Sequence, residues 1–445
     1  MLINILFTLF YFLVDLKGTN VLYLFIIQSS ISLYLTYNRD RQYVSIFTIT
    51  HLIGILIGMS NINLINVAGT VENTTFGYVI VPNIDLACKI FVIGFSFFYV
   101  GLDLSKEKSL PSIKYEISDR LNDRLFYYIL ILSNRFSLIF ILSVLHMGFL
   151  GSLINIFIFS GLFGIIYYYR LWKETNNRNY RTYSLILYVE LTVTAVMKSY
   201  LRGDIILPTV ILFMAVVITD KNLKLLTSQR VIPFVFVFFL FSYIFSDLGS
   251  YRGQKSNFEI ISNSILGSNT ASYVNTVKYG ETRKASILQR TSTLAPLTVI
   301  IKLVNDHDFY GGLASAPLLE ALIPRFLYPD KATVRLGAWF AVEGGLAYKN
   351  DQGNINNSVN MTIPGELYLD FGWWGIVIGC TLVGFFYGVL WNSTEFHASA
   401  SNLTGTIFGG YLMTAALQYG MGADLQLMLS LLSLYILFLI IKWIL

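Results

Sequence analysis

Long runs of apolar residues recur along this chain, and they constrain its fold more than any other feature. A helix needs about 20 apolar residues to span the hydrocarbon core of a bilayer. Inside a membrane each such run must be helical, because lipid offers no partner for backbone amide and carbonyl groups. Runs of this length, or nearly so, cover residues 2–16, 21–36, 43–60, 86–102, 125–145, 148–169, 183–199, 204–219, 231–246, 365–390, 404–420 and 424–444. The sequence therefore predicts an all-α polytopic membrane protein with about twelve transmembrane helices.

The composition agrees with this fold class and excludes others. Of the 445 residues, 55% are hydrophobic and only 13% are charged, which is too little charge for a soluble domain of this length. The net charge of +5 is spread over short connections between apolar runs, and no nucleic-acid-binding motif occurs, so we expect no nucleic-acid partner. Cys88 and Cys380 both lie in apolar runs, which indicates small buried residues and neither a disulfide nor a metal pair.

The distribution of Lys and Arg predicts the orientation of the chain. With both termini in the cytoplasm, the inside connections hold fifteen basic residues and the short outside connections hold three. The fifteen are Arg39, Arg41, Lys106, Lys108, Lys114, Arg120, Arg124, Arg170, Lys173, Arg178, Arg181, Lys221, Lys224, Arg230 and Lys442; the three are Lys17, Lys198 and Arg202. Cytoplasmic loops of membrane proteins carry this excess. The inside loop 391–403, which has no Lys or Arg, is the exception.

Three regions follow from this orientation. Residues 1–246 form an N-terminal bundle of about nine helices, residues 247–364 form a large extracytoplasmic loop, and residues 365–445 form about three further helices. Within the loop, the apolar stretch Ser292–Val304 predicts a helix that lies in or against the membrane. Because loops of this length are usually functional, we expect the loop to contribute to the functional site.

Two charged residues are predicted inside the membrane. Arg135 lies at the centre of one span and Glu190 near the middle of another, where an unpaired charge costs at least ~2.5 kcal/mol. We expect the two to contact each other. A structural buried pair is favoured over a proton or substrate path, because no further acidic residues continue a route from them.

Arginines from distant parts of the chain are predicted to meet at the outer membrane surface. Arg202 lies in the turn Ser199–Asp204, Arg252 follows a span, and Arg325 lies beside Pro324 with Arg335 further along. A guanidinium group is always charged and binds phosphate oxygens through two parallel hydrogen bonds. Converging arginines would suit a diphosphate at the level of the lipid headgroups. The alternative is that each side chain reaches toward lipid phosphates as an interfacial anchor.

Candidate acids and bases lie near the same surface. Glu366 enters an apolar span at its outer end, His307 is the only histidine of the large loop, and Glu343 lies in the same loop. Each could act as a general base, although a solvated loop residue is the alternative for His307. The triplet Asp306–Asp308 resembles the DxD motif of metal-dependent glycosyltransferases, but three residues are a weak signal, and we expect neither a metal nor a cofactor.

Three motifs resemble those of oligosaccharide repeat-unit polymerases, the Wzy type of O-antigen and capsule polymerase. They are the turn Tyr-Leu-Arg-Gly-Asp at 200–204, Ile-Pro-Arg-Phe-x-x-Pro-x-Lys at 323–331, and Gly-Glu-Leu-Tyr-x-x-Phe-Gly-x-x-Gly at 365–375. The resemblance in layout covers the whole chain. It implies a fold similar to the metal-independent (GT-C-like) membrane glycosyltransferases.

The resemblance also implies an activity and a place in the cell. Such an enzyme of the bacterial cytoplasmic membrane moves a growing glycan from one polyprenyl diphosphate to another lipid-linked repeat unit, on the outer face. Diphosphate binding is implied for Arg202, Arg252 and Arg325. The implied partners are the polyprenyl-diphosphate-linked oligosaccharide, membrane lipids and a chain-length-regulating co-polymerase, in lipopolysaccharide or capsule synthesis. An O-antigen ligase or other lipid-linked-sugar transferase remains an alternative, as does a polysaccharide flippase.

The orientation can be tested by labelling single cysteines. We expect residues near 115, 175 and 225 to face the cytoplasm, and residues near 75 and 300 to react with a membrane-impermeant reagent in intact cells, because basic loops stay inside. Labelling of residues near 300 only after permeabilisation would place the arginines in the wrong compartment and contradict the site assignment.

Overall fold

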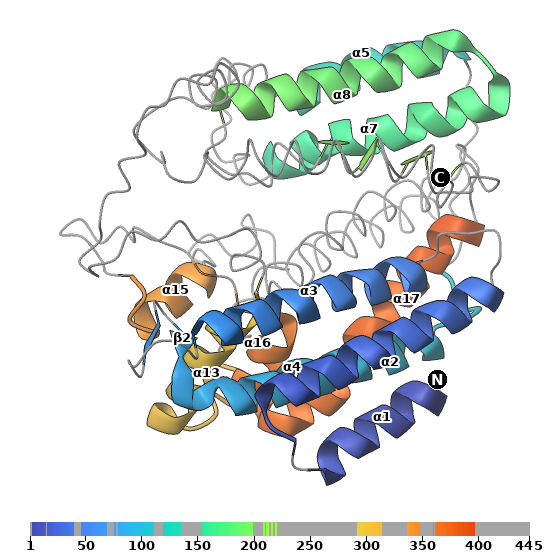
Figure 1. Ribbon diagram of the computed structural model, residues 1–445. Coiled ribbons are helices and arrows are strands. Elements are labelled where there is room, and N and C mark those ends of the chain that lie inside the picture. Colours follow the sequence, from blue (N-terminus) through green and yellow to red (C-terminus); the bar gives the residue numbers. More distant parts are fainter. Residues whose placement is uncertain are drawn as a thin grey trace. The chain divides into compact units, whose positions relative to one another are not determined.

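The computed structural model describes a little over half of the chain, and it is mostly helical (Figure 1). The described residues are 2–14, 16–39, 46–68, 75–76, 79–110, 119–134, 154–198, 208–209, 211–212, 215–216, 219, 292–313, 336–347, 359 and 361–396. The chain divides into two compact units. The first contains Met1–Ser109, Ala285–Asn392 and Ala415–Leu445, and the second contains Leu110–Lys284 and Ser393–Thr414.

The N-terminal part of the first unit is a set of packed helices. They are α1 (Leu2–Leu13), α2 (Gly18–Arg39), α3 (Ile46–Ala68) and α4 (Ile84–Leu104). Figure 1 shows α2, α3 and α4 side by side, and α1 contacts both α2 and α4. A short antiparallel hairpin, β1 (Thr75–Phe76) and β2 (Val79–Ile80), and the turn η1 (Val81–Asn83) lead into α4. Helix α4 is buried on most sides, which makes it the centre of this unit.

Five further elements complete the first unit. They are α13 (Leu294–His307), α15 (Leu336–Glu343), α16 (Ile363–Trp374), the π-helix η4 (Gly375–Gly379) and α17 (Cys380–Phe396). Helix α13 packs against α4, α16 and the hairpin. It confirms the helix expected over 292–304, but it ends three residues later. Residues Leu294–Ile301 are all buried, as in a helix enclosed by protein. Its location in or against the membrane stays a prediction.

Side chains of neighbouring elements hold α13 at its N-terminus. Asn61 on α3 donates to Thr293 Oγ1 (3.2 Å) and accepts from the Thr293 amide (3.0 Å). Thr298 Oγ1 accepts from the Ile80 amide (3.1 Å), and Asn83 donates to the Thr298 carbonyl oxygen (3.0 Å). These bonds satisfy backbone groups that would otherwise be buried without partners. They also link α13 to α3, to the end of β2 and to η1.

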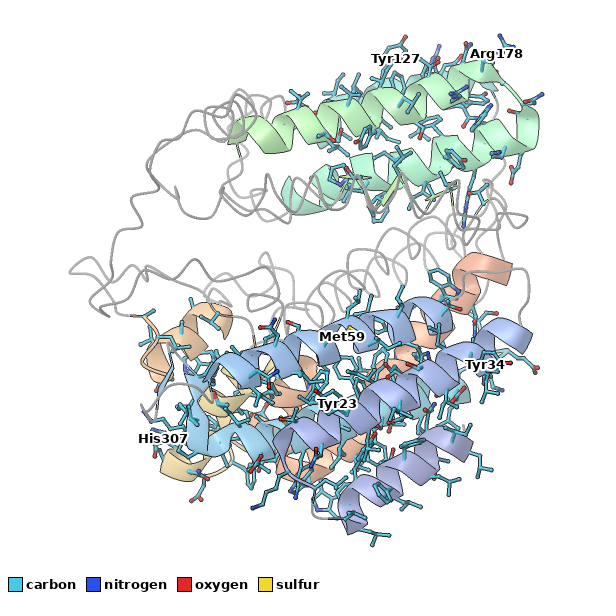
Figure 2. The ribbon with its side chains drawn as sticks, in the orientation of Figure 1. Tyr23, Tyr34, Met59, Tyr127, Arg178 and His307 are labelled. Carbon is cyan, nitrogen blue, oxygen red and sulfur yellow. The ribbon has the colours of Figure 1, made fainter. Side chains whose placement is uncertain are left out.

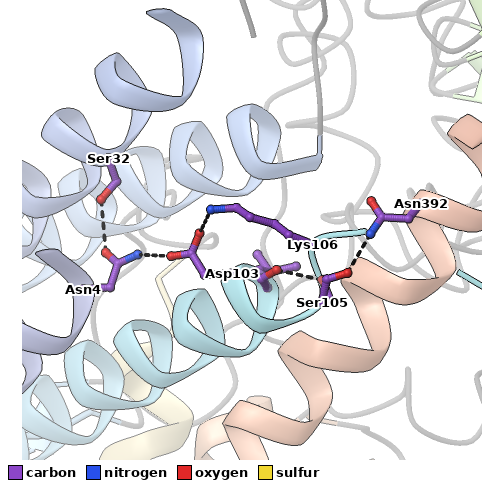
Figure 3. A network of polar contacts seen from close by, with 7 residues as sticks. Asn4, Ser32, Asp103, Ser105, Lys106 and Asn392 are labelled. Carbon is purple, nitrogen blue, oxygen red and sulfur yellow. Dashed lines mark hydrogen bonds and ion pairs between the residues drawn. The ribbon is translucent and has the colours of Figure 1, made fainter. Parts of the chain in front are cut away.

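A buried polar network joins α1, α2 and α4 (Figure 3). Asn4 donates to Asp103 (3.1 Å) and accepts from Gln28 and Ser32 (3.2 and 3.1 Å). Gln28 Oε1 in turn accepts from the hydroxyl groups of Tyr11 and Ser96 (3.0 and 3.1 Å). In lipid, apolar burial does not drive helices together, so hydrogen bonds of this kind fix the arrangement of neighbouring helices. At the end of the network Asp103 pairs with Lys106.

Close backbone contact joins α4 to α17. A Cβ atom added to Gly101 would lie 2.0 Å from the Thr381 carbonyl oxygen, and one added to Gly384 would lie 2.1 Å from the Phe98 carbonyl oxygen. Small residues at such positions let two membrane helices approach each other closely. Near the end of α17, Asn392 donates to the carbonyl oxygens of Ser105 and Lys108 (2.8 and 3.0 Å).

The second unit contains an antiparallel helical bundle. Its described helices are α5 (Asp119–Ser133), α7 (Ile154–Thr175) and α8 (Arg178–Lys198), with α7 and α8 joined by a tight turn at Asn176 (φ 58°). Aromatic rings fill its interior: Phe126 stacks on Tyr183 (centroids 4.1 Å apart) and meets Tyr168 edge to face. Figure 2 labels Tyr127 and Arg178 on this unit, and both are exposed.

The described helices are of the kind that the sequence predicts for an all-α membrane protein. Three of them are long and apolar enough to cross a membrane: Gly18–Thr36, Val81–Leu104 and Ile363–Ser393. Exposed apolar side chains occur on the surface of the described helices, as on the lipid side of a span; examples are Tyr23 and Tyr34 on α2 and Met59 on α3 (Figure 2). The expected spans 231–246, 404–420 and 424–444 lie outside the described residues, and the total of about twelve stays a prediction.

The contact between α4 and α17 leads to a stability prediction. Gly384→Ala should push the two helices apart, because its Cβ atom would overlap the Phe98 carbonyl oxygen. Overpacking of this kind costs about 1–3 kcal/mol. The matched control, Leu382→Ala, removes a side chain that is 51% exposed on the same helix. Thermal unfolding in detergent should show a lower Tm for Gly384→Ala only, and equal Tm values would contradict the close contact.

Candidate functional site

An interrupted helix is the most unusual feature of the first unit. Helix α16 begins at Thr362, whose side-chain oxygen accepts from the Gly365 amide (3.0 Å), and Pro364 lies in its first turn. Such a cap and an early proline are typical of a helix N-terminus. The helical geometry then breaks at Gly372 (φ 59°, ψ −140°), a conformation that only glycine adopts readily. The chain resumes as the π-helix η4 and continues into α17.

The break leaves two backbone carbonyl groups without their usual helical partners. In a continuous helix the carbonyl oxygens of Leu369 and Asp370 would accept from the amides four residues later. Here the loop after α13 takes that place: the Tyr310 amide donates to Leu369 O (3.1 Å) and the Gly311 amide donates to Asp370 O (2.9 Å). The Gly312 amide also donates to Asp370 Oδ1 (3.2 Å). The loop Asp308–Leu313 therefore caps the first half of the broken helix.

Glu366 is a buried carboxylic acid on this capped half-helix. Its side chain is only 5% exposed, and no donor among the described residues forms a hydrogen bond with its Oε1 atom. Asp370 follows one helical turn later, on the same face, and is 1% exposed. Buried polar groups normally have partners, so a carboxyl oxygen without one indicates a functional role.

Small residues explain why Glu366 is buried. A Cβ atom added to Gly365 would lie 2.5 Å from Ile300 Cδ1 of α13, so that helix crosses α16 in close contact beside Glu366. On α4, a Cβ atom added to Gly94 would lie 2.7 Å from Pro364 Cβ. Two helices, α13 and α4, thus approach the N-terminal half of α16 closely at glycine positions.

The loop and α15 place aromatic rings close to the capped helix. Tyr310 meets Trp339 of α15 edge to face, with ring centroids 5.5 Å apart. Phe309 meets Tyr368 of α16 in the same way (5.7 Å), and its ring lies against Gly372. Desolvation raises the pKa of the Tyr310 phenol, and the nearby Glu343 carboxylate raises this pKa further.

The other two candidate bases flank this loop. His307 is the last residue of α13 and is exposed at its end (Figure 2). Glu343 is the last residue of α15 and is also exposed. The structure therefore brings all three candidates to the elements around one loop, with Glu366 buried and the other two at the surface.

Asp306 and Asp308 lie on either side of His307, and both are exposed. Within the described residues, no group of three or more His, Cys, Asp or Glu side chains is arranged to hold a metal ion. The absence of a metal site from the whole chain stays a prediction. Cys88 and Cys380 are buried and form no disulfide, which confirms the interpretation of both as small buried residues.

Several predicted residues lie outside the described part of the chain. They are Arg135, Arg202, Arg252, Arg325 and Arg335. Glu190 is described on α8, half-buried, and it accepts from Ser133 Oγ (3.3 Å) and Thr194 Oγ1 (3.1 Å). Ser133 precedes Arg135 by two residues in the sequence, and the ion pair between Glu190 and Arg135 stays a prediction.

Sequence reasoning missed Asp370 and the loop residue Tyr310. The spacing of Glu366 and Asp370, four residues apart before a glycine-rich run, was a signal for two acids on one helical face. Tyr310 carried no such signal, because its role depends on contacts with residues far along the chain.

Comparisons with known proteins identify no relative: no protein-family model, curated protein or solved structure matches this chain.

The break in α16 leads to a second stability prediction. Gly372→Ala should lower the Tm in detergent, because the alanine Cβ atom would lie 2.9 Å from the Phe309 ring in a strained conformation that costs about 1–3 kcal/mol. Gly311→Ala is the matched control, since Gly311 also has positive φ (62°) but no atom within 4 Å of the added Cβ.

The double variant Gly372→Ala/Phe309→Ala should recover part of the loss, because it removes the overlapping ring. Equal Tm values for Gly372→Ala and Gly311→Ala, together with no recovery in the double variant, would show that the Phe309 ring does not stabilise the break at Gly372.

Proposed function

We propose that this protein is a membrane glycosyltransferase that polymerises polyprenyl-diphosphate-linked oligosaccharide repeat units on the outer face of a bacterial cytoplasmic membrane. The observation that carries the proposal is Glu366, a buried carboxyl group in the first turn of a broken helix; the Oε1 atom of this group accepts no hydrogen bond from the described residues. Its motif, Gly-Glu-Leu-Tyr-x-x-Phe-Gly-x-x-Gly, is one of the three that resemble repeat-unit polymerases.

The proposed reaction joins two lipid-linked glycans. A hydroxyl group at the non-reducing end of the acceptor repeat unit attacks the anomeric carbon of the donor glycan. The new glycosidic C–O bond forms as the bond from the anomeric carbon to the diphosphate breaks, and the electron pair leaves with the polyprenyl diphosphate. Glu366 takes the hydroxyl proton as general base. No donor among the described residues occupies its Oε1 atom, and a carboxylate oxygen without a donor keeps its lone pair available for this proton.

The leaving group requires positive charge at the same surface. Arg202, Arg252 and Arg325 supply it in this proposal, and Arg335 lies nearby along the sequence. Preorganised guanidinium groups stabilise the charge that develops on the diphosphate, without a metal ion. His307 and Glu343 are the alternative bases, and their exposure makes them less suited to a reaction from which water must be excluded.

A second function is favoured by one observation. An interrupted membrane helix with buried acids is also typical of transporters, which build midplane sites from half-helices. The break at Gly372, inside the candidate span Ile363–Ser393, therefore supports a polysaccharide flippase as the runner-up. An O-antigen ligase would share the donor chemistry of a polymerase and differ in its acceptor.

Polymer formation in detergent separates these functions. Purified protein incubated with lipid-linked repeat units, extracted from host membranes, should produce a ladder of glycans. A flippase would produce none, because it moves lipids and forms no bond, and a ligase would transfer glycan only to a different acceptor. Chelators should have no effect on the ladder, since the reaction requires no metal.

The base assignment makes a specific prediction in this assay. Glu366→Gln should lower the rate by about 10²–10⁴-fold, because the amide cannot accept the proton. The control Glu174→Gln changes an exposed acid on α7 of the other unit and should leave the rate unchanged. If Glu366→Gln keeps the wild-type rate while the separate variant Glu343→Gln or His307→Ala is inactive, the general base is the residue whose variant is inactive.

A further inference from the structure

Three aromatic side chains form a surface cluster beside the broken helix. Phe309 and Tyr310 come from the loop Asp308–Leu313, and Trp339 comes from α15. We call Phe309, Tyr310 and Trp339 the aromatic platform. Phe309 is 50% exposed, and Tyr310 and Trp339 are partly exposed. Large aromatic surfaces of this kind are normally buried unless they contact a ligand, a partner or lipid.

Hydrogen bonds and ring contacts hold the platform in a fixed position. The Tyr310 and Gly311 amides are bonded to carbonyl oxygens of α16, and the Leu313 amide donates to Tyr310 O (3.1 Å), which closes a turn. Trp339 supports the Tyr310 ring edge to face at 88°, and Tyr368 supports Phe309 at 83°. Rings fixed in this way lose little conformational entropy when a ligand binds.

Three exposed carboxylate groups lie on the elements that carry the platform or next to them in sequence. Asp308 adjoins Phe309 in sequence, Asp306 lies two residues earlier, and Glu343 lies one helical turn after Trp339; all three are exposed. Lys302 is also exposed, one turn before Asp306, so among the described residues of this rim three groups are acidic and one is basic. Carboxylates accept hydrogen bonds from hydroxyl groups and repel phosphate. An acidic rim therefore suits a hydroxyl-rich neutral ligand and disfavours an anionic lipid headgroup.

We propose that the aromatic platform binds a sugar ring of the acceptor oligosaccharide, with the carboxylates of its rim accepting hydrogen bonds from the sugar hydroxyl groups. Sugar rings have apolar faces that pack on aromatic rings, while their equatorial hydroxyl groups point outward to polar partners. The identity of the oligosaccharide as acceptor rests on the proposed function; the binding of a sugar ring does not.

The platform has a defined place relative to the proposed base. Its loop is bonded to Leu369 and Asp370, and Glu366 lies one turn earlier on the same half-helix. A glycan held on the platform is thus anchored to the same helix as the base. In this proposal the carboxylates of the rim disfavour phosphate, and the predicted arginines, not the aromatic platform, bind the diphosphate.

Binding can be measured without relying on polymerisation. The probe is the oligosaccharide released by mild acid from the polyprenyl-linked fraction of host membranes, titrated into full-length protein in detergent by calorimetry. Phe309→Leu and Trp339→Leu should each weaken the Kd by about three- to ten-fold, since each removes one aromatic contact. Glu343→Gln, which changes an exposed side chain and should fold normally, should weaken the Kd in the same direction.

The matched control is Trp374→Leu, which removes an aromatic ring that is 75% exposed on α16 outside the platform. Its Kd should equal that of the wild type. Absence of binding by the wild type, or Kd values within two-fold of wild type for all three platform and rim variants, would overturn the proposal. If the wild type binds the oligosaccharide but forms no polymer, the proposed function is wrong and sugar binding by the platform stands. If Phe309→Leu and Trp339→Leu form polymer with an unchanged acceptor KM, the proposed function stands and the platform does not bind the acceptor.

Discussion

The hydrogen bonding of two backbone carbonyl groups, those of Leu369 and Asp370, underlies the arrangement of the whole site. A backbone group buried in lipid or protein must have a partner, so a helix can break at Gly372 only if another segment supplies donors. The loop Asp308–Leu313 supplies them. The same bonds then fix the platform, because the loop that caps the helix also carries Phe309 and Tyr310. Interruption of the helix and presentation of the aromatic rings are two results of one constraint.

Close packing of small residues determines where the acid lies. Gly365 lets α13 cross directly beside Glu366, and Gly94 lets α4 approach Pro364. Larger residues would hold the helices apart and let water reach the carboxyl group. The polar networks around Asn4 and Asn61 act on whole helices, because their hydrogen bonds join α1 to α2 and α4, and α3 to α13. Glu366 Oε1 differs from these groups in having no such partner among the described residues.

The surface chemistry around the loop divides the proposed reaction into two parts. The platform and its rim combine aromatic rings with carboxylates, a pairing that suits sugar hydroxyl groups. The leaving diphosphate needs cations, which the predicted arginines supply in this proposal. In such a division, binding of the glycan on a rigid surface would place its hydroxyl group, and the arginines would act only where negative charge develops.

The sequence by itself determined the class of the fold, because apolar runs and helical period are local properties. It predicted helices, the helix near 292–304 and Glu366 as a candidate, and the described residues bear out the helices. Several glycines occur between residues 365 and 388, and nothing local distinguishes Gly372 as a break from Gly384 as a contact. Only the tertiary structure decided that, since the break depends on a loop whose Gly312 amide bonds to Asp370, 58 residues away. Tyr310 and Trp339 met for the same reason: no local pattern encodes which distant amides will satisfy the carbonyl groups of an interrupted helix.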